Sequence, residues 1–308
     1  MTERVRIGTR GSRLALRQAE LVADALRCAW PGLAVEIVAI RTSGDRLATA
    51  HLASVGGKGL FVKEIEEALV DGRVDMAVHS LKDLPAELPA GLTLAAFPAR
   101  EDPRDVLVSR SGAGLAGLPP AARVATSSLR RRVQLLVERA DLVVEAIRGN
   151  VDTRLRKLWD APYDALVMAA AGLRRLGLEP QGVHVLDPEL MVPAVGQGTL
   201  AVETRQDDAE TRHLAAAVDD GATRAAAAAE RAFLEVIGGS CTTPLGAYAR
   251  PEGGRLRLSA FLATPDGRRV LRDGADLAEG TPADLGRRVA DRMLGAGAAE
   301  IVRAGLGA

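Results

Sequence analysis

Apolar residues recur along the first two thirds of the chain in two patterns, which together predict an α/β fold. Short apolar runs such as 34–40 and 76–78 are bounded by polar residues or glycine, as buried strands are. Between them, apolar residues return at helical spacing, for example over 60–70. Strands that alternate with helices are typical of an open, largely parallel sheet. The pattern predicts strands at 4–8, 34–40, 74–79, 92–97, 105–108, 142–147 and 165–168.

Two stretches of the chain repeat the same order of features. Gly59 to Asp83 runs from glycine through a helix and an aspartate to a strand and a polar loop, and Gly149 to Arg175 does the same. We therefore expect two similar α/β domains whose carboxyl strand ends line one cleft. A closing clamp of two such domains suits small anions.

The pattern changes near the end of the chain and predicts a smaller α+β domain. Apolar and polar residues alternate over 256–262, Asp266-Gly267 forms a turn, and a return strand follows. Helices are expected at about 219–237 and after Thr281. A strand within 193–205 is expected to return to the first sheet. The domains expected are 1–98 with 199–217, then 103–194, then 221–308, with a hinge or crossing at the proline-rich stretch 98–103.

Lys82 and Asp83 directly follow the buried strand that starts at Met76. Ligands of open α/β sheets bind outside the carboxyl ends of the strands, so both side chains are expected at the mouth of a site. The cation would hold an anion, and the carboxylate would stabilise a cation or move a proton. Taken alone, the stretch 76–85 also fits a surface turn with a local ion pair.

Arginines gather at a second predicted strand end. Residues 130–132 are consecutive arginines in the first turn of a helix that begins after Ser128. Cations are favoured at the carboxyl end of a helix, so three of them at the amino end indicate a bound anion. The stretch 123–157 holds nine basic and four acidic residues. A solvated basic face explains some of these, but not Arg130, Arg131 and Arg148, which each follow a predicted strand.

A glycine-rich segment precedes the helix at 60–70. Residues 41–59 have little regular pattern and end in Gly56-Gly57-Lys58-Gly59. This is not a Walker A loop, because Gly59 stands where a magnesium-binding Ser or Thr is needed. We interpret the segment as a lid over the site.

Composition is that of an ordinary globular protein of a reducing cytosol. The chain has 308 residues, of which 47% are hydrophobic and 26% charged, and its forty basic residues balance forty acidic ones, so nucleic-acid binding is not indicated. It has no apolar leader and no run of eighteen apolar residues, so we expect no signal peptide and no membrane span. Cys28 and Cys241 lie far apart and the four histidines are scattered, so neither disulfides nor a metal site are expected.

Six short motifs occur together along the chain. They are Ile7-Gly8-Thr9-Arg10-Gly11-Ser12, Gly56-Gly57-Lys58-Gly59-Leu60-Phe61, His79-Ser80-Leu81-Lys82-Asp83, Thr126-Ser127-Ser128-Leu129-Arg130-Arg131, Arg148-Gly149-Asn150 and Val195-Gly196-Gln197-Gly198. Each is weak alone, but the set, in this order and spacing, resembles the porphobilinogen deaminase (hydroxymethylbilane synthase) family over nearly the whole chain.

The resemblance implies a transferase of haem and porphyrin biosynthesis with three domains, the first two similar to periplasmic anion-binding proteins and flanking a cleft. It would condense four porphobilinogen molecules head to tail into hydroxymethylbilane and release ammonia. A dipyrromethane cofactor, made from substrate, would be joined by a thioether to Cys241, which the residues alone suggest is a small buried side chain. Ser240 stands where family members often have glycine. The resemblance also implies a cytoplasmic monomer without nucleic-acid or membrane partners.

The resemblance also implies roles for individual residues. Asp83 would be catalytic and would stabilise positive charge on pyrrole N–H groups, while proton transfer to the leaving amine stays open. Arginines would bind the acetate and propionate arms of substrate and cofactor, because their forked N–H groups match carboxylates. The implied cofactor-binding residues are Cys241, Lys82, Asp83, Thr126, Ser128, Arg130, Arg131, Gly149 and Arg154. The implied substrate-binding residues are Arg10, Ser12, Gln18, Arg148, Arg154, Arg175, Gln197 and Gly198, and the lid residues are Asp45 and Lys58.

Two other classes of protein remain open from the residues. A cytosolic two-domain anion-binding or sensor protein explains the clamp and the arginines, but neither Asp83 nor a third domain with Cys241. A hydrolase with a cysteine nucleophile needs a histidine partner for Cys241, and the spacing offers none.

Overall fold

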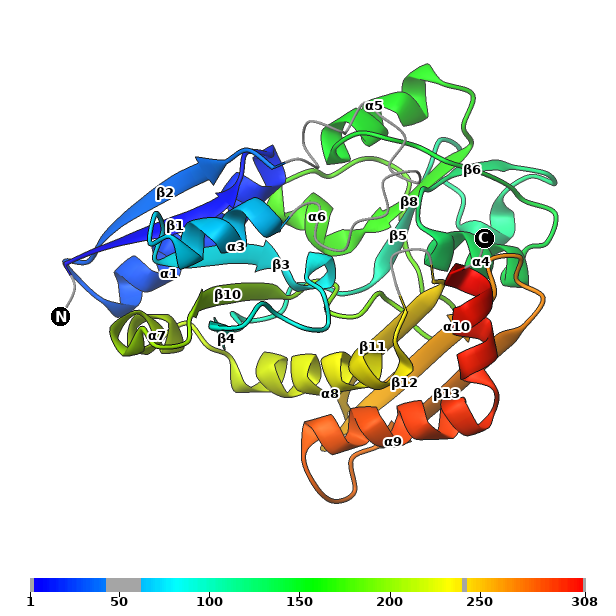
Figure 1. Ribbon diagram of the computed structural model, residues 1–308. Coiled ribbons are helices and arrows are strands. Elements are labelled where there is room, and N and C mark those ends of the chain that lie inside the picture. The colour runs from blue at the N-terminus through cyan, green and yellow to red at the C-terminus, as the bar shows by residue number, and fades with distance from the viewer. Residues whose placement is uncertain (1–2, 43–61, 240–242, 307–308) are drawn as a thin grey trace. The chain divides into compact units, whose positions relative to one another are not determined.

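The computed structural model describes residues 3–42, 62–239 and 243–306. Contacts within the chain divide it into two compact units, Met1–Glu101 with Gly198–Arg224 and Asp102–Gln197 with Ala225–Ala308. The first change of unit falls in the proline-rich stretch 98–103, where the sequence predicts a hinge or crossing. The elements of both units are labelled in Figure 1.

The first unit is built on a five-stranded sheet in the order β2-β1-β3-β10-β4. β2, β1 and β3 are parallel, and β10 runs antiparallel between β3 and β4. β10 comes from the unit's second stretch, so the predicted return of a strand to the first sheet is confirmed. The strands are β1 (Arg4–Arg10), β2 (Ala34–Ile40), β3 (Met76–Ser80), β4 (Leu92–Ala96) and β10 (Leu200–Arg205).

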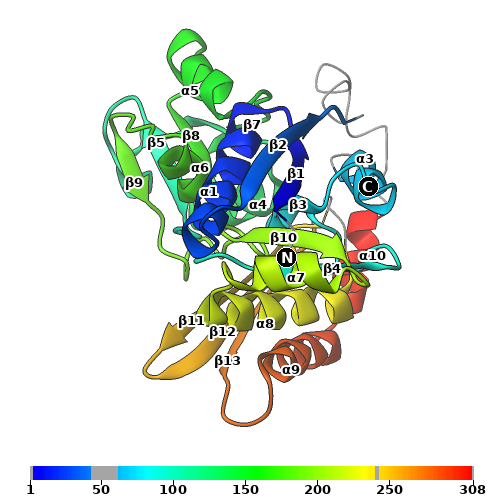
Figure 2. The same cartoon turned by 90° about the vertical axis from the view of Figure 1, so that its left-hand side faces the viewer.

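Helices cover both faces of this first sheet (Figure 2). α1 (Arg13–Ala29) and α7 (Ala209–Ala216) pack on one face, because Leu26 and Leu214 belong to one buried cluster with residues of the strands. α3 (Lys63–Val70) packs on the other face through a separate apolar cluster. The helical spacing of apolar residues in the sequence is therefore explained by burial against the sheet.

The second unit contains a five-stranded sheet with the same pattern of strand directions, in the order β7-β6-β8-β5-β9. β7, β6 and β8 are parallel, and β5 runs antiparallel between β8 and β9. The prediction of two similar α/β sheets is confirmed. The strands are β5 (Asp105–Ser109), β6 (Arg123–Ala125), β7 (Val143–Glu145), β8 (Ala165–Ala169) and β9 (Val183–Val185).

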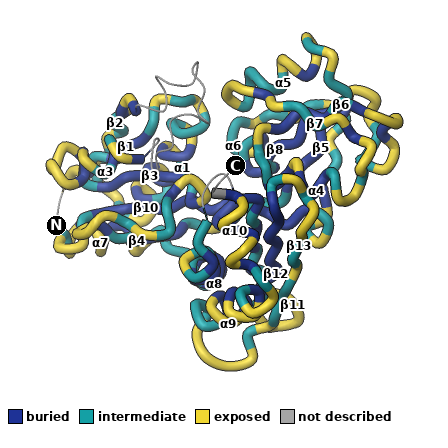
Figure 3. Tube along the Cα trace, turned by 45° about the vertical axis from the view of Figure 1, so that its right-hand side comes forward, coloured by how far each residue is buried: buried dark blue, intermediate teal, exposed yellow. Residues whose placement is uncertain are grey.

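Helices again lie on both faces of the second sheet. α4 (Leu129–Glu138) packs on one face, where its Leu135 shares a buried cluster with strand residues. α5 (Val151–Asp160) and α6 (Ala170–Arg175) pack on the other face. The central strands of both five-stranded sheets are almost entirely buried, as the dark blue segments of Figure 3 show.

The second unit also contains a three-stranded antiparallel sheet in the order β11-β12-β13, whose last two strands form the predicted hairpin. Three helices share one apolar core with this sheet. The last predicted helix begins at Pro282, and Thr281 and Asp284 form a capping box at its start. The elements are β11 (Leu245–Glu252), β12 (Arg255–Ala263), β13 (Val270–Asp276), α8 (Gly221–Ile237), α9 (Pro282–Gly295) and α10 (Ala298–Leu306). In the described parts of the chain, no helix combines the length and apolarity that crossing a bilayer requires.

Candidate functional site

A cluster of buried positive charge in the second unit lies at the start of α4, directly after β6. Ser128 is the N-cap, and its Oγ accepts a hydrogen bond from the backbone N–H of Arg131 at 3.4 Å. The cap places Arg130 and Arg131 in the first turn, which contains no acidic residue. Both arginines are nevertheless buried, with 5% and 6% of their surface exposed. Two buried guanidinium groups require nearby acceptors and negative charge.

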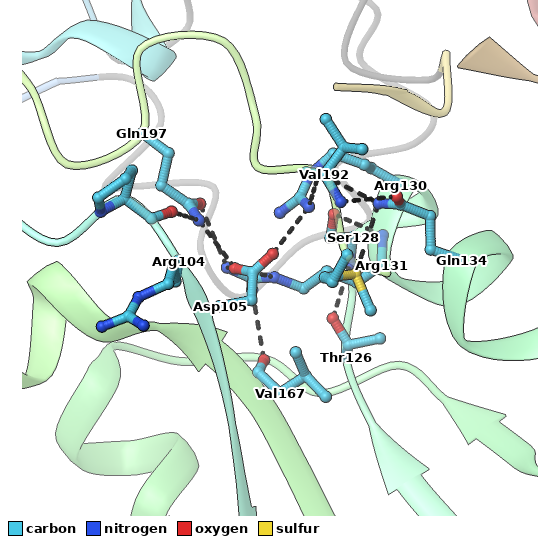
Figure 4. A network of polar contacts seen from close by, with 12 residues as sticks. Arg104, Asp105, Thr126, Ser128, Arg130, Arg131, Gln134, Val167, Val192 and Gln197 are labelled. Atoms are coloured by element: carbon cyan, nitrogen blue, oxygen red, sulfur yellow. Dashed lines mark hydrogen bonds and ion pairs between the residues drawn. The ribbon is translucent and has the colours of Figure 1, made fainter. Parts of the chain in front are cut away.

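Asp105, the first residue of β5, supplies a carboxylate to both arginines (Figure 4). Its Oδ1 accepts from Nε and Nη2 of Arg131 at 3.0 and 2.8 Å. Its Oδ2 lies 2.7 Å from Nη1 of Arg130, without the alignment of a hydrogen bond, so this contact is an ion pair. Burial alone would raise the pKa of Asp105, but the charges of Arg130 and Arg131 outweigh burial and hold this pKa well below its usual range.

Gln197 fixes the other side of this carboxylate. The side chain of Gln197 is fully buried, and its Nε2 donates to Oδ1 of Asp105 at 2.9 Å and to the carbonyl oxygen of Pro103 at 2.7 Å. The backbone just before Gln197 is fixed by Glu230 of α8, whose Oε2 accepts a hydrogen bond from the backbone N–H of Gly196 at 2.6 Å. Gln197 therefore bonds to the protein's own polar groups in this structure.

Positive charge remains in excess around Asp105. The sequence predicts an anion beside the arginines of 130–132, and one such anion is the chain's own Asp105. A single carboxylate cannot balance both Arg130 and Arg131. Arg154 adds to the excess: burial, and to a lesser degree the charge of Arg131, lowers the pKa of Arg154. Such a donor set fits a ligand that carries several carboxylates.

The other residues predicted in this region occupy the same strand ends and helix starts. Thr126 is buried after β6, and its Oγ1 accepts from the backbone N–H of Ser128 at 3.3 Å. Gly149 has a φ of +118°, and a Cβ at this position would lie 2.6 Å from the Thr153 side chain, so a glycine is required. Its carbonyl oxygen accepts from Nε of Arg154 at 2.7 Å. Arg148 is exposed, whereas Arg175 is half-buried at the end of α6.

In the first unit, the predicted acid stands in a short 3₁₀ turn, η3 (Leu81–Asp83), that follows β3 directly. Lys82 and Asp83 are both exposed. Asp83 forms no hydrogen bond or ion pair with any other residue that the structure describes. An ion pair between Lys82 and Asp83 is therefore not observed, and the carboxylate of Asp83 is available to a ligand.

Three further predicted residues lie at the neighbouring strand end of the same sheet. Arg10 is the last residue of β1, and Ser12 caps α1 by accepting from the backbone N–H of Ala15 at 3.3 Å. Gln18, buried on α1, donates from Nε2 to Oγ of Ser80 at 2.9 Å. Gln18 thus joins α1 to the carboxyl end of β3, just before Asp83.

A buried polar cluster that the sequence does not reveal lies behind this turn. Nε2 of His79 is 3.1 Å from Oε2 of Glu203, and both side chains are almost completely buried. Glu66 of α3 belongs to the same group of charges: burial, reinforced by Glu203 and opposed by His79, raises the pKa of Glu66 to about 7. The residues come from three segments of the sequence, so no local pattern predicts the cluster.

Several predicted positions lie outside the described residues or at the edges of the units. Asp45, Lys58, Ser240 and Cys241 are outside the described ranges. Gly198 begins the second stretch of the first unit, and its carbonyl oxygen accepts from the backbone N–H of Glu101 at 3.1 Å. Within the ranges described, no group of three or more His, Cys, Asp and Glu side chains is placed to hold a metal ion.

Comparison with known protein families gives matches along nearly the whole chain. Residues 5–213 match a family model described as porphobilinogen deaminase, dipyromethane cofactor binding domain. Residues 224–295 match the C-terminal domain model of the same family.

Curated relatives named porphobilinogen deaminase are similar over their full length. The protein of Roseiflexus castenholzii is 52% identical over 96% of this chain and 98% of its own. That of Syntrophobacter fumaroxidans is 48% identical over 98% of both chains. Among solved structures, the methionine binding protein MetQ is similar over 72% of this chain and 92% of its own, with 17% identity and a TM-score of 0.45.

Proposed function

Because the chain belongs to the porphobilinogen deaminase family, we propose that its buried arginines and its exposed Asp83 serve the reaction of that family. The chain is a transferase of tetrapyrrole biosynthesis. It condenses four porphobilinogen molecules head to tail into hydroxymethylbilane, releases ammonia and uses a dipyrromethane cofactor.

The observation that supports this proposal best is the buried arginine pair with a single carboxylate. When bound, the cofactor supplies a covalently held pyrrole pair from which the product chain grows, and its arms are carboxylates. Arg130 provides a forked pair of N–H donors for these arms, and Arg131 and Arg154 add excess positive charge beside it. Thr126, Ser128 and Gly149 complete the proposed set, with Lys82 and Asp83 of the first unit. Cys241 is the proposed attachment point.

The remaining polar residues are proposed to bind the substrate. Arg10, Ser12, Arg148 and Arg175, together with the backbone at Gly198, would hold its acetate and propionate arms. Gln18 and Gln197 are buried and bonded to Ser80 and Asp105, so we assign them to the support of neighbouring site residues. Asp45 and Lys58 are proposed as residues of a lid.

Asp83 is the proposed catalytic residue. Loss of ammonia leaves positive charge on the pyrrole of the substrate, and a carboxylate that accepts hydrogen bonds from pyrrole N–H groups stabilises this charge. The exposure of Asp83 and its lack of a partner among the described residues support this role. Proton transfer to the leaving amine is a secondary proposal, because Asp83 is the acidic residue of the turn.

We further propose the division into three domains, 1–98 with 199–217, 103–194 and 221–308, and a cytoplasmic monomer. The three separate sheets support the domains, since each has its own apolar core. The equal numbers of acidic and basic residues give no indication of a nucleic-acid partner.

Intact mass of the purified protein tests the cofactor assignment directly. We expect the wild-type mass to exceed the sequence mass by two linked pyrrole units, and Cys241→Ala to have the sequence mass. Cys28→Ala, which changes the other cysteine, is the matched control and should retain the excess. An unmodified wild-type mass, or an excess that survives in Cys241→Ala, would contradict the proposed attachment.

A further inference from the structure

We propose that Asp105 is a positioning residue that holds Arg130 and Arg131 in place, so that the Nε–Nη2 edge of Arg130 and the surplus positive charge of the pair serve the carboxylates of the cofactor; this rests on the cofactor role proposed above for the two arginines. Asp105 lies at the start of β5 and is fully buried. Among the described residues, it is the carboxylate that contacts both arginines.

The two guanidinium groups meet Asp105 with different edges. Arg131 uses its Nε and Nη2 groups on Oδ1, and its Nη1 donates to the carbonyl oxygen of Val167 at 3.3 Å. Arg130 meets Oδ2 only with Nη1, which also donates to the carbonyl oxygen of Val192 at 2.6 Å. Nε and Nη2 of Arg130 therefore bond to no described residue and keep the paired edge that a ligand carboxylate recognises.

The charge of Asp105 explains why both cations stay in this arrangement. Two buried guanidinium groups on consecutive residues repel each other, and at least one would turn away without a shared anion. Asp105 neutralises one positive charge and leaves the other for a ligand. A second carboxylate here would cancel the positive charge that attracts the cofactor. Without any carboxylate, the guanidinium groups would have no fixed direction.

Asp105 is itself held in place by the fold. Gln197 bonds to its Oδ1 at 2.9 Å, and the backbone carbonyl of Asp105 accepts from the N–H of Leu186 at 2.9 Å. The fold therefore fixes the direction of the Asp105 carboxylate, and this direction sets the orientation of the two arginines.

The test compares how fast different apoproteins acquire the cofactor. Asp102→Asn is the matched control, because the Asp102 side chain is nearly as buried, at 5% exposed against 0% for Asp105, and also contacts two arginines, Arg104 at 2.7 Å and Arg174 at 2.9 Å. Each apoprotein is incubated with porphobilinogen, its intact mass is followed with time, and its unfolding in urea is measured separately. We expect Asp105→Asn to gain the cofactor mass at least tenfold more slowly than wild type, and Asp102→Asn to gain it at the wild-type rate.

Arg131→Leu distinguishes the cofactor role of the arginines from the positioning role of Asp105. If Arg131→Leu gains the cofactor normally, the proposed cofactor role of the arginines fails. If Arg131→Leu fails to gain it while Asp105→Asn gains it at the wild-type rate, that role stands and the positioning role of Asp105 is overturned. Equal slowing of Asp105→Asn and Asp102→Asn, in step with their loss of stability, would also overturn it.

If Asp105→Asn does not fold, Gln197→Met tests the positioning role of Asp105 instead. This change keeps every charge and the approximate side-chain size, and removes the hydrogen bond that the Gln197 amide donates to Asp105. We expect cofactor gain to slow several-fold in a folded Gln197→Met protein, and a wild-type rate would contradict the positioning role.

Discussion

Asp83 and Asp105 show how the environment gives two identical side chains different roles. Asp105 is buried between two arginines, so its negative charge is used within the protein. Asp83 is exposed in a short turn after β3 and has no partner among the described residues. Removal of the first charge should therefore disturb the structure around it, whereas removal of the second should disturb the reaction alone.

Asp83→Asn tests this difference at the residue scale. We expect the free energy of unfolding to change by less than about 0.5 kcal/mol, as for exposed residues without special contacts. Release of ammonia from porphobilinogen should fall by a factor of about 10² or more, the typical effect of removing a group that stabilises transition-state charge. Steady-state assays and urea unfolding measure the two effects, and near wild-type turnover would remove Asp83 from the mechanism.

At the residue scale, the sequence predicts the site residues that are unusual for their place in a helix or strand. Arg130 and Arg131 are unusual because they are cations at a helix start, and Ser128 is a common N-cap. Asp105 is an ordinary residue at the beginning of a strand, and its partners lie 25 and 26 residues further on. Only the pairing of β5 with β8, beside α4, makes its role visible.

At the scale of elements, packing brings together charges that no element shows by itself. Glu66 lies on α3, His79 on β3 and Glu203 on β10. The contact of His79 with Glu203, and the effect of both charges on Glu66, depend on the insertion of β10 beside β3. The helices and the longer strands follow from periodicity. β9 has only three residues, Val183–Val185, which is too short for a recognisable pattern.

Glu66→Gln should reveal this cluster as a pH-dependent gain in stability. Burial is the main cause that raises the pKa of Glu66 from its ordinary value of 4.5 to about 7, so the folded state binds the proton more tightly than the unfolded state. Its stabilising contribution is present below about pH 4.5 and is lost as the pH rises through about 7. The neutral amide avoids this loss.

We expect Glu66→Gln to raise the free energy of unfolding more at pH 8 than at pH 5, by about 1 kcal/mol, because water reaches part of the side chain and weakens the effect. Urea unfolding at both pH values measures this difference. Glu67→Gln, on the exposed side of the same helix, should show no such difference. Equal effects of Glu66→Gln at both pH values would contradict the assignment.

At the scale of the whole molecule, the two five-stranded sheets share one pattern of strand directions, and the repeat in the sequence predicts two such similar α/β domains. The inner antiparallel strand is the last strand of its sheet along the chain in the first unit and the first in the second. The sequence also predicts the hairpin of the third sheet. It does not predict how the third sheet is joined to the rest of the second unit, because the joining residues lie far apart in the sequence. They include an apolar cluster of Val133, Val192, Phe261 and Ala263 and one buried carboxylate. Glu230 of α8 accepts from the backbone N–H of Gly196 at 2.6 Å and from that of Ala249, on β11, at 2.8 Å.

Glu230→Ala should weaken the second unit substantially. Two buried N–H groups would lose their acceptor, and each costs about 1–3 kcal/mol when left unsatisfied. We expect the free energy of unfolding to fall by roughly 2–5 kcal/mol. Glu235→Ala, an exposed position on the same helix, should change it by less than about 0.5 kcal/mol. A loss below about 1 kcal/mol for Glu230→Ala would contradict this account.

The insertion of β10 between β3 and β4 has a consequence for the order of events during synthesis on the ribosome. β4 ends at Ala96, but its neighbour β10 ends only at Arg205, so the first sheet lacks an inner strand until about a hundred more residues have been translated. At about 5–20 residues per second, this wait lasts roughly 5–20 s. All strands of the second sheet lie within Asp105–Val185. We therefore expect the sheet encoded second to form first, while β3 and β4 of the nascent chain wait for the strand that pairs with both of them.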